Sequence, residues 1–146
     1  MPVDISGFGV RVNLTASETF PSGLEITSLA DDADPIDLPS VQLRDKAMGV
    51  NGDLVAWSKA NPIMLTLAVI PNTDDDANLE ILALSNRAAK GRRAVQDAIT
   101  ATVTYPDGRT KRLLRGVVTD GYLGHGVASA GRLKTKSYIF AFEDMQ

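Results

Sequence analysis

The stretch ITATVTYPDGRT, residues 99–110, predicts a β-hairpin and with it a chain built mainly from antiparallel strands. Ile99, Ala101 and Val103 alternate with threonines, which is the period-2 pattern of a strand with one buried face. The Pro-Asp-Gly segment that follows supplies a tight turn, because proline fixes its own φ and glycine tolerates a positive φ. Residues 110–119 then return as the second strand.

Similar alternation lies upstream of this hairpin. Apolar residues at every second position predict a first strand within residues 7–20, and residues 24–29 follow as a second strand after a Pro-Ser-Gly turn. Further strands are expected at residues 41–46 and 54–58, joined through an Asn-Gly pair that is typical of a tight hairpin. Trp57, in the last of these strands, is expected either in the core or as an interface anchor.

Two strands are apolar at almost every position. They are IMLTLAVI at residues 63–70 and YIFAF at residues 138–142, which is the centre of a last strand at 133–143. A strand with two apolar faces must be covered on both. We expect that cover from a helix or from a neighbouring subunit that continues the sheet.

A helix is expected to begin at Thr73, because its side chain can accept first-turn amides and the three aspartates at 74–76 complement the helix dipole. Lys90 and Gly91 fit the last turn and its cap. The apolar residues span a wide face, which predicts that the helix plugs one side or end of a barrel: Leu79, Ile81, Leu82 and Leu84. The fold class is therefore mainly β, an antiparallel barrel or sandwich of about seven to eight strands with one flanking α-helix, in a single domain over residues 1–146.

Composition excludes most catalytic chemistry. The chain contains no cysteine, which removes disulfides, thiolate nucleophiles and cysteine-ligated zinc and fits assembly in a reducing cytoplasm. Its only histidine is His125, so neither a histidine relay nor a multi-histidine metal site can form within one chain. No serine, threonine or lysine stands among activating partners. We therefore expect no enzyme and no cofactor.

Charge and hydropathy exclude two further kinds of partner. The formal net charge is -3 and the 15 basic residues are not concentrated in one tract, so tight nucleic-acid binding is not expected. No run reaches the ~18 to 20 apolar residues that cross a bilayer, and residues 1–9 lack the basic and apolar segments of an export signal. Neither membrane insertion nor export is therefore expected.

The densest group of carboxylates lies at residues 30–40, where Asp31, Asp32, Asp34 and Asp37 occur beside two prolines. The prolines and aspartates predict an exposed arm or loop. Calcium prefers oxygen ligands at such spacing, but the segment lacks the glycine and the terminal glutamate of the twelve-residue calcium loop. A solvated loop is the favoured interpretation, and a metal site is the alternative.

A second long loop, at residues 121–132, is punctuated by glycines around His125. It lacks the G-x-G-x-x-G spacing and the following helix of a phosphate loop, and the sequence offers His125 no orienting partner. Basic residues near the helix end and the central hairpin form a patch only if those elements lie side by side. Solvated or salt-bridged side chains are the favoured interpretation of this set: Lys90, Arg92, Arg93, Arg109, Lys111, Arg112 and Arg115.

Five stretches carry a resemblance over nearly the whole chain: DISGFG at 4–9, DDADP at 31–35, GVNGDL at 49–54, TVTYPDG at 102–108 and SAGRLK at 129–134. In them the chain resembles small structural proteins of contractile-tailed bacteriophages, of the tail tube or tail fibre kind. The resemblance implies the tail-tube fold, shared with type VI secretion tube proteins, in which copies form stacked hexameric rings. It also implies a virion tail protein that assembles in the cytoplasm of the host bacterium.

The resemblance further implies partners and surfaces. Neighbouring copies would join their sheets into an inner barrel that passes DNA without binding it, and sheath, tube or baseplate proteins would be further partners. Loops at 30–40, 46–53 and 121–132 are the expected contacts. The interface residues expected in them are Asp31, Asp32, Asp34, Asp37, Asn51, Asp53, Tyr122, His125 and Arg132.

Two alternatives stay open from the sequence. A baseplate or tube-associated ring protein that contacts tube and sheath would have the same fold. A monomeric β module that binds calcium or another ligand through one of the long loops would instead show a ligand-dependent melting temperature.

Overall fold

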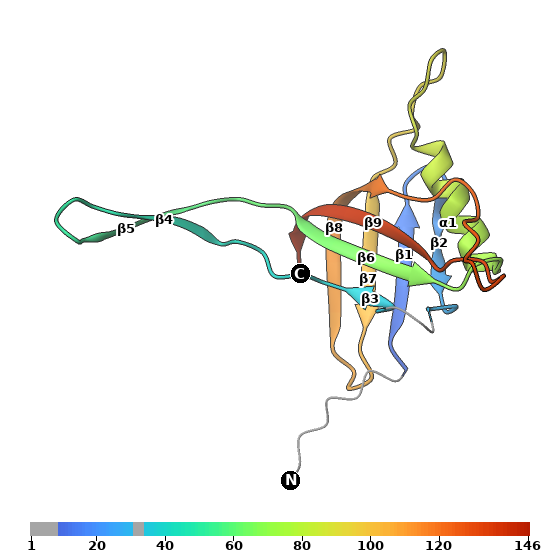
Figure 1. Cartoon of the computed structure of the whole chain (residues 1–146), viewed down its shortest axis with the longest axis horizontal. Coiled ribbons are helices and arrows are strands. Elements are labelled where there is room, and N and C mark those ends of the chain that lie inside the picture. The colour runs from blue at the N-terminus through green and yellow to red at the C-terminus, as the bar shows by residue number, and fades with distance from the viewer. Residues whose placement is uncertain (1–8, 31–33) are drawn as a thin grey trace, which may run out of the picture.

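The computed structural model describes residues 9–30 and 34–146 (Figure 1). Its elements in chain order are β1 (Arg11–Ala16), β2 (Phe20–Ile26), β3 (Ile36–Asp37), β4 (Arg44–Met48), β5 (Leu54–Ser58), β6 (Ile63–Val69), α1 (Asp74–Ser85), β7 (Ile99–Thr104), β8 (Thr110–Asp120) and β9 (Lys136–Met145). No helix in the described residues is both long enough and apolar enough to cross a membrane.

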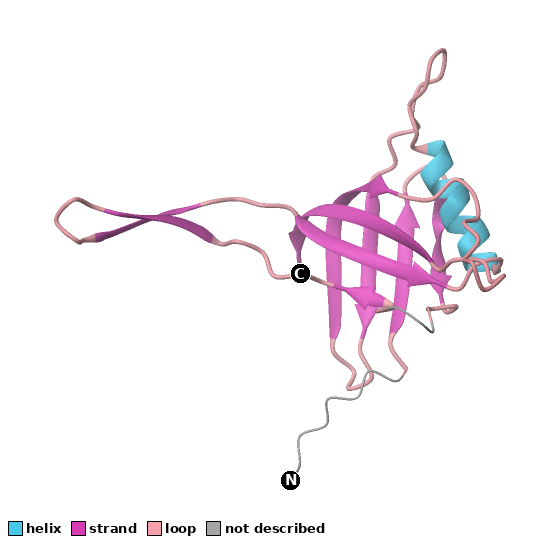
Figure 2. Ribbon diagram, viewed as in Figure 1, coloured by secondary structure: helices cyan, strands magenta, loops and turns pink. Residues whose placement is uncertain are grey.

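Within the described residues, seven strands form one antiparallel sheet in the order β2-β1-β7-β8-β9-β6-β3, while β4 and β5 form a separate two-stranded sheet. Figure 2 shows the larger sheet curling into a half barrel, with β6 and β9 crossing over β1, β7 and β8. The prediction of a mainly β, antiparallel barrel or sandwich with a flanking helix is confirmed in this curled form. The helix lies across one end of the curled sheet.

The hairpin predicted at residues 99–110 lies near the centre of the large sheet as β7 and β8. The Tyr105 backbone N–H donates to the Arg109 carbonyl across the turn at 2.8 Å, and Gly108 adopts the positive φ that this turn requires. Both strands, the turn between them and their pairing are therefore as predicted.

The turn between the first two strands differs from the prediction. It was expected at residues 21–23, but Pro21 and Gly23 lie inside β2, and the chain turns at residues 17–19. The carboxylate of Asp97 accepts the Glu18 and Thr19 backbone N–H groups at 2.8 and 2.9 Å and fixes the turn there. Proline is tolerated in β2 because β2 is an edge strand and needs no donor on its outer side.

The inner face of the curled sheet supplies the hydrophobic core. Alternate residues of β1, β7 and β9 are fully buried there: Val12, Leu14, Ala16, Ile99, Ala101, Val103, Tyr138, Phe140 and Phe142. Full burial of one such large apolar side chain contributes roughly 1.5 to 3 kcal/mol. In β6 the consecutive residues Leu67, Ala68 and Val69 are all buried, as a strand covered on two faces requires, whereas Ile139 and Ala141 of β9 stay partly exposed on the outer face.

The helix begins as predicted. The Thr73 hydroxyl accepts the Asp76 backbone N–H at 3.3 Å and caps the first turn. The first-turn aspartates, however, do more than complement the helix dipole. Asp75 is buried, and one of its carboxylate oxygens accepts the Thr27 and Ser28 backbone N–H groups at 2.7 Å each. The start of the helix is therefore attached to the segment that follows β2.

A buried charged group fixes the same end of the helix to β9. The Lys136 ammonium lies 3.3 Å from the Asp76 carboxylate and 3.4 Å from that of Glu80, and the Tyr138 hydroxyl donates to Asp76 at 3.0 Å. Burial, together with the charges of Asp76 and Glu80 and the hydrogen bond to Asp76, raises the pKa of Tyr138 well above its usual range. The phenol therefore stays a hydrogen-bond donor.

The helix ends earlier than predicted. Its last residue is Ser85, and Lys90 and Gly91 lie in an exposed loop beyond it. Asn86 ends the helix because its side-chain amide donates to the Leu82 carbonyl and to Asp97, both at 2.9 Å, and its side-chain oxygen accepts the Asp97 backbone N–H.

The buried face of the helix is also narrower than predicted. Leu79, Leu82 and Ala83 pack into the core, but Ile81 is 50% exposed and Leu84 is 42% exposed. The helix lies against one side of the half barrel, so only residues three and four apart reach the sheet. The predicted wide buried face is therefore wrong, because the helix buries only a narrow stripe of residues.

Candidate assembly interface

A two-stranded arm projects from the half barrel and contributes no side chain to its core. It consists of residues 43–59 and contains β4, β5 and the turn between them (Figure 1). The turn is closed by hydrogen bonds from the Gly49 backbone N–H to the Asp53 carbonyl at 2.8 Å and from Gly52 to Gly49 at 2.9 Å. Gly52 adopts a positive φ, which confirms the tight Asn-Gly hairpin predicted from the sequence.

Large apolar side chains of the arm are exposed to solvent along its whole length. They are Leu43, Met48, Val50, Leu54, Val55 and Trp57. Met48 and Leu54 are each 68% exposed, and the core of the half barrel contains no side chain from residues 43–59. An isolated two-stranded hairpin is marginally stable in water, and contiguous exposed apolar surface marks an interaction site. The arm is therefore a candidate interaction surface.

Trp57 is 47% exposed in β5, so its predicted place in the core is wrong. The sequence pattern around it gives a strand correctly, but a two-stranded sheet that stands away from the body has no second layer to bury an aromatic ring. Its alternative role as an interface anchor stays a prediction.

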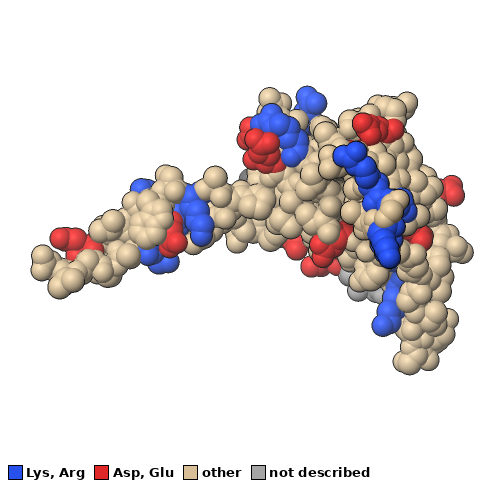
Figure 3. Space-filling model, turned by 90° about the horizontal axis from the view of Figure 1, so that it is seen from above, with Lys and Arg blue, Asp and Glu red and all other residues tan. Residues whose placement is uncertain are grey.

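The register of β4 against β5 gives the arm two different faces. The cross-strand pairs are Arg44↔Ser58, Asp45↔Trp57, Lys46↔Ala56, Ala47↔Val55 and Met48↔Leu54. Paired residues share a face and successive pairs alternate. One face, here called the basic face, therefore carries Arg44 and Lys46. The opposite, apolar face carries Val55 and Trp57. Seen from above, charged groups lie along the arm while its outer end is mostly uncharged (Figure 3).

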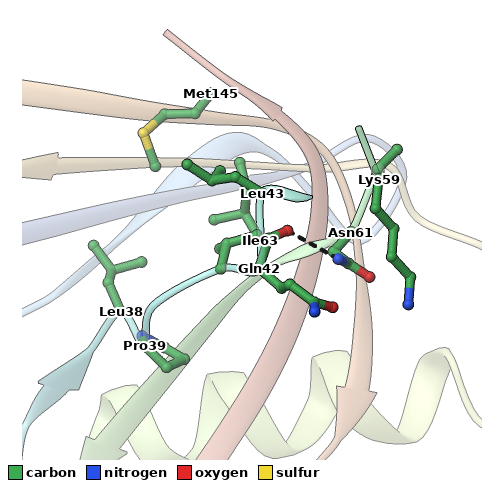
Figure 4. Close-up of a pocket in the computed structure, with 10 residues that line it drawn as sticks. Leu38, Pro39, Gln42, Leu43, Lys59, Asn61, Ile63 and Met145 are labelled. Carbon is green, nitrogen blue, oxygen red and sulfur yellow. Dashed lines mark hydrogen bonds between the residues drawn. The ribbon is translucent and has the colours of Figure 1, made fainter. Parts of the chain in front are cut away.

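A groove lies at the root of the arm, where the arm joins β3, β6 and the end of β9 (Figure 4). Its volume is about 440 Å³. The apolar side chains that line it are Leu38, Pro39, Val41, Leu43, Ala60, Ile63 and Met145. Gln42, Lys59 and Asn61 complete the lining, and the Asn61 side-chain amide donates to the Gln42 carbonyl at 2.9 Å. An open apolar groove thus adjoins the exposed apolar face of the arm.

The segment at 30–40, expected as an exposed arm or loop, does not project as an arm in its described part, residues 34–40. Asp34 is exposed, but Asp37 ends β3, which pairs with β6, and Ile36 and Leu38 pack against the core. Those apolar side chains hold the segment on the body, so the projecting arm is residues 43–59 instead. Asp31 and Asp32 lie outside the described residues.

The remaining interface predictions fall at two separate ends of the molecule. Asn51 and Asp53 lie in the turn at the outer end of the arm. Tyr122, His125 and Arg132 lie in the loop after β8, which is folded back by a bridge between Val127 and Leu133 and lies near the helix, away from the arm (Figure 1). The structure therefore does not bring the predicted interface residues together on one surface.

The possible basic patch does not form as one surface. Residues 87–93 precede β7 and the turn at residues 105–109 follows it, so they lie at opposite ends of that strand. Arg115 instead lies 3.3 Å from both Glu143 and Asp144, and Arg109 lies 3.5 Å from Asp107. These are the solvated and salt-bridged side chains that the sequence favours.

The part of the chain that the structure describes contains no group of three or more potential metal-ligating side chains. The aspartate-rich segment of the calcium alternative includes Asp31 and Asp32, which are not described.

Comparison with known proteins gives one family and one fold. A family model described as "Tail fiber protein gp32" matches residues 3–146. The structure described as "Cryo-EM structure of the anti-feeding prophage (AFP) baseplate, 6-fold symmetrised" contains a chain with a TM-score of 0.59 and 13% identity, covering 100% of this chain and 96% of that one. At such identity the likeness establishes a shared fold.

A second solved structure is less similar. It is described as "Cryo-EM Structure of an Extracellular Contractile Injection System, PVC sheath/tube terminator in extended state", and its chain has a TM-score of 0.48 and 13% identity, covering 100% of this chain and 97% of that one. The comparison with curated proteins gives no match.

Proposed function

The chain belongs to the Tail fiber protein gp32 family and is a structural protein of the tail, and on that premise we propose that it is a ring-forming subunit of a contractile phage tail, joined to its neighbours by the arm. The observation that carries the proposal is the exposure of large apolar side chains on a hairpin that contributes no side chain to the core. A structural subunit uses such a surface for assembly, and an isolated monomer leaves it in water at a cost in solubility.

Two positions in a tail require a subunit of this kind, the tube and a baseplate ring. The half-barrel fold is shared with a chain of a 6-fold symmetrised baseplate, which supports a hexameric ring at the baseplate end of the tail. The tube position expected from the sequence requires the same ring, stacked many times. DNA that passes through such a ring meets a chain with a formal net charge of -3, which favours passage over binding.

The proposal also includes other tail proteins as partners, assembly in the host cytoplasm and no catalytic activity. Its support is the structural family to which the chain belongs and a surface suited to protein contact. His125 is exposed in the loop after β8 and stays among the proposed interface residues.

The test measures the mass and shape of the full-length protein by light scattering and negative-stain microscopy over a range of concentrations. We expect sixfold rings as concentration rises. Stacking into tubes of variable length would assign the tube position, and single or paired rings would assign the baseplate position. A protein that stays monomeric when concentrated, and also when mixed with the other proteins of its tail, would overturn the proposal.

An arm-shortened variant makes the test specific. Residues 44–58 are replaced by a short glycine-serine turn, which leaves every core residue in place. We expect it to melt as a folded protein and to form no rings. A matched control is Val95→Ser, which removes an exposed apolar side chain outside the arm and is expected to form rings normally. Rings from the arm-shortened variant would show that assembly does not depend on the arm.

A further inference from the structure

We propose that the outer end of the arm of one copy seats in the groove at the root of the arm of the next copy. This inference rests on the proposed function, because it names the partner of the arm as a second copy of this chain. The outer end is residues 48–54, here called the tip. The acceptor is the groove of about 440 Å³ described above, here called the root groove.

The polarity of the tip matches that of the root groove. The tip exposes the side chains of Met48, Val50 and Leu54, with no charged residue among residues 48–52. The root groove is lined mainly by apolar side chains, among them Leu38 and Ile63. Its volume lies within the range of about 300 to 1,000 Å³ that is usual for pockets filled by apolar ligands. It therefore has room for more than one side chain of the tip.

One charge on each surface is left without a partner. Asp53 is the carboxylate of the tip and Lys59 is the ammonium that lines the root groove, and both are exposed. In the described part of the chain neither side chain forms an ion pair. Seating the apolar tip in the root groove of another copy brings these opposite charges to the same contact, which fixes the direction of insertion.

The tip does not reach the root groove of its own chain. Each strand of the arm has five residues and rises ~3.3 Å per residue, so the tip stands roughly 16 Å beyond the root. The two surfaces therefore meet only between copies. Each copy gives one tip and accepts another, which is a heterologous contact that closes into a ring or continues as a filament.

Charge reversal tests the contact directly. Asp53→Lys and Lys59→Asp each place two like charges at the contact, and each is expected to raise the concentration of half-assembly roughly 3- to 10-fold. In a mixture of the two variants, alternating copies place opposite charges at every contact. The double variant also places opposite charges at every contact, because each copy carries both reversals. Both are expected to assemble as the unmodified chain does. Two defects that add in the double variant would overturn the inference.

The absence of cysteine allows a second test that does not depend on charge. Val50→Cys and Val41→Cys are prepared as separate proteins that melt like the unmodified chain, and they are mixed under mild oxidation. We expect a disulfide-linked heterodimer of the two proteins on a non-reducing gel, beyond any homodimers that each protein forms alone. The matched control mixes Val50→Cys with Val95→Cys, which is exposed outside the root groove and is expected to give no heterodimer above background.

The outcomes separate this inference from the proposed function. Rings without a tip-to-groove disulfide would overturn the inference and leave ring assembly standing, with another tail protein as the occupant of the root groove. Failure of the unmodified chain to form rings with or without its tail partners would overturn both. A disulfide together with rescue by the mixed charge variants would establish the contact.

Discussion

β5 and β7 are both short strands rich in apolar residues, yet one is exposed and the other is buried. Ile99, Ala101 and Val103 of β7 are fully buried, whereas Val55 and Trp57 of β5 are each about half exposed. The local pattern therefore fixes the strand conformation of both, and the surrounding layers decide burial. β7 lies between β1 and β8 under the curl of the sheet, while β5 has only β4 beside it. Nothing else in the described residues covers β5, which is why we propose a contact with another molecule there.

The largest change in the free energy of unfolding is expected from a cavity in the buried core. Phe140→Ala removes a fully buried ring from the inner face of β9 and is expected to lower the free energy of unfolding by about 3 to 5 kcal/mol. Chemical denaturation of dilute protein measures it. Leu54→Ala in the arm removes a side chain of similar hydrophobicity that is 68% exposed, and a change within about 0.5 kcal/mol is expected. Equal losses would mean that the arm is buried in the monomer.

A smaller loss of stability is expected at Gly116, where a core side chain lies close to the backbone. A Cβ added to Gly116 would lie 2.3 Å from the ring of Phe142, which is buried, so the ring would have to shift. Gly116→Ala is therefore expected to lower the free energy of unfolding by about 1 to 3 kcal/mol through overpacking.

The control for this overpacking is Gly124→Ala in the exposed loop after β8, where an added Cβ has no atom within 4 Å. Its melting temperature is expected to match that of the unmodified chain. A Gly116→Ala variant as stable as this control would show that the Phe142 ring has freedom to shift, and that the inner face of the sheet is less tightly packed than its burial indicates.

Local signals explain what the sequence predicts well. The hairpin at 99–110 has its alternation, turn residues and partner strand within about twenty residues, and Thr73 has the capping side chain of a helix start. The helix end and the first turn could not be predicted in the same way. Both depend on Asp97, which lies far from Thr19 in the sequence and accepts or donates hydrogen bonds only once the fold is formed.

The same Asp97 gives a pH-dependent contribution to the stability of the half barrel. Burial by itself raises the pKa of this carboxyl, but hydrogen bonds from the Thr19 and Asn86 side chains and from the Thr19 and Glu18 backbone N–H groups outweigh it and lower the pKa below its ordinary value of 3.8. A carboxylate with a lowered pKa stabilises the folded state above its ordinary pKa, and this stabilisation is lost as pH falls through the lowered value.

Asp97→Asn is therefore expected to lose about 1 to 2 kcal/mol at pH 7, because the hydrogen bond from the Asn86 side chain has no acceptor, and to show a flatter decline below pH 4. Unfolding curves from pH 7 to pH 2 measure both features. Asp107→Asn, which changes an exposed carboxylate in the β7–β8 turn, is the matched control. If the slopes of the two variants below pH 4 coincide, Asp97 contributes no separate acid-sensitive step.

The assembly surface was only partly predictable. The Asn-Gly pair correctly predicts the turn that carries Asn51 and Asp53, but nothing local distinguishes an arm that stands in solvent from a hairpin packed on the sheet. The aspartates and prolines at 30–40 predict an exposed arm or loop, yet Ile36 and Leu38 pack against the core and hold residues 34–40 on the body. Which segment projects therefore depends on its contacts with the core, which form only in the folded chain.

The smallest effect on folding is expected on the exposed side of the comparison, at Trp57. Trp57→Ala should change the free energy of unfolding of dilute protein by no more than about 0.5 kcal/mol, because Trp57 is 47% exposed and lies outside the core. The same change should raise the concentration of half-assembly about ten-fold or more, since aromatic residues in buried contacts carry much of the binding free energy. Ser58→Ala, one residue along on the basic face, is the matched control and should leave both quantities unchanged. If Trp57→Ala lowers the free energy of unfolding as much as Phe140→Ala and leaves the concentration of half-assembly unchanged, the arm belongs to the body, and β5 differs from β7 only in its degree of burial.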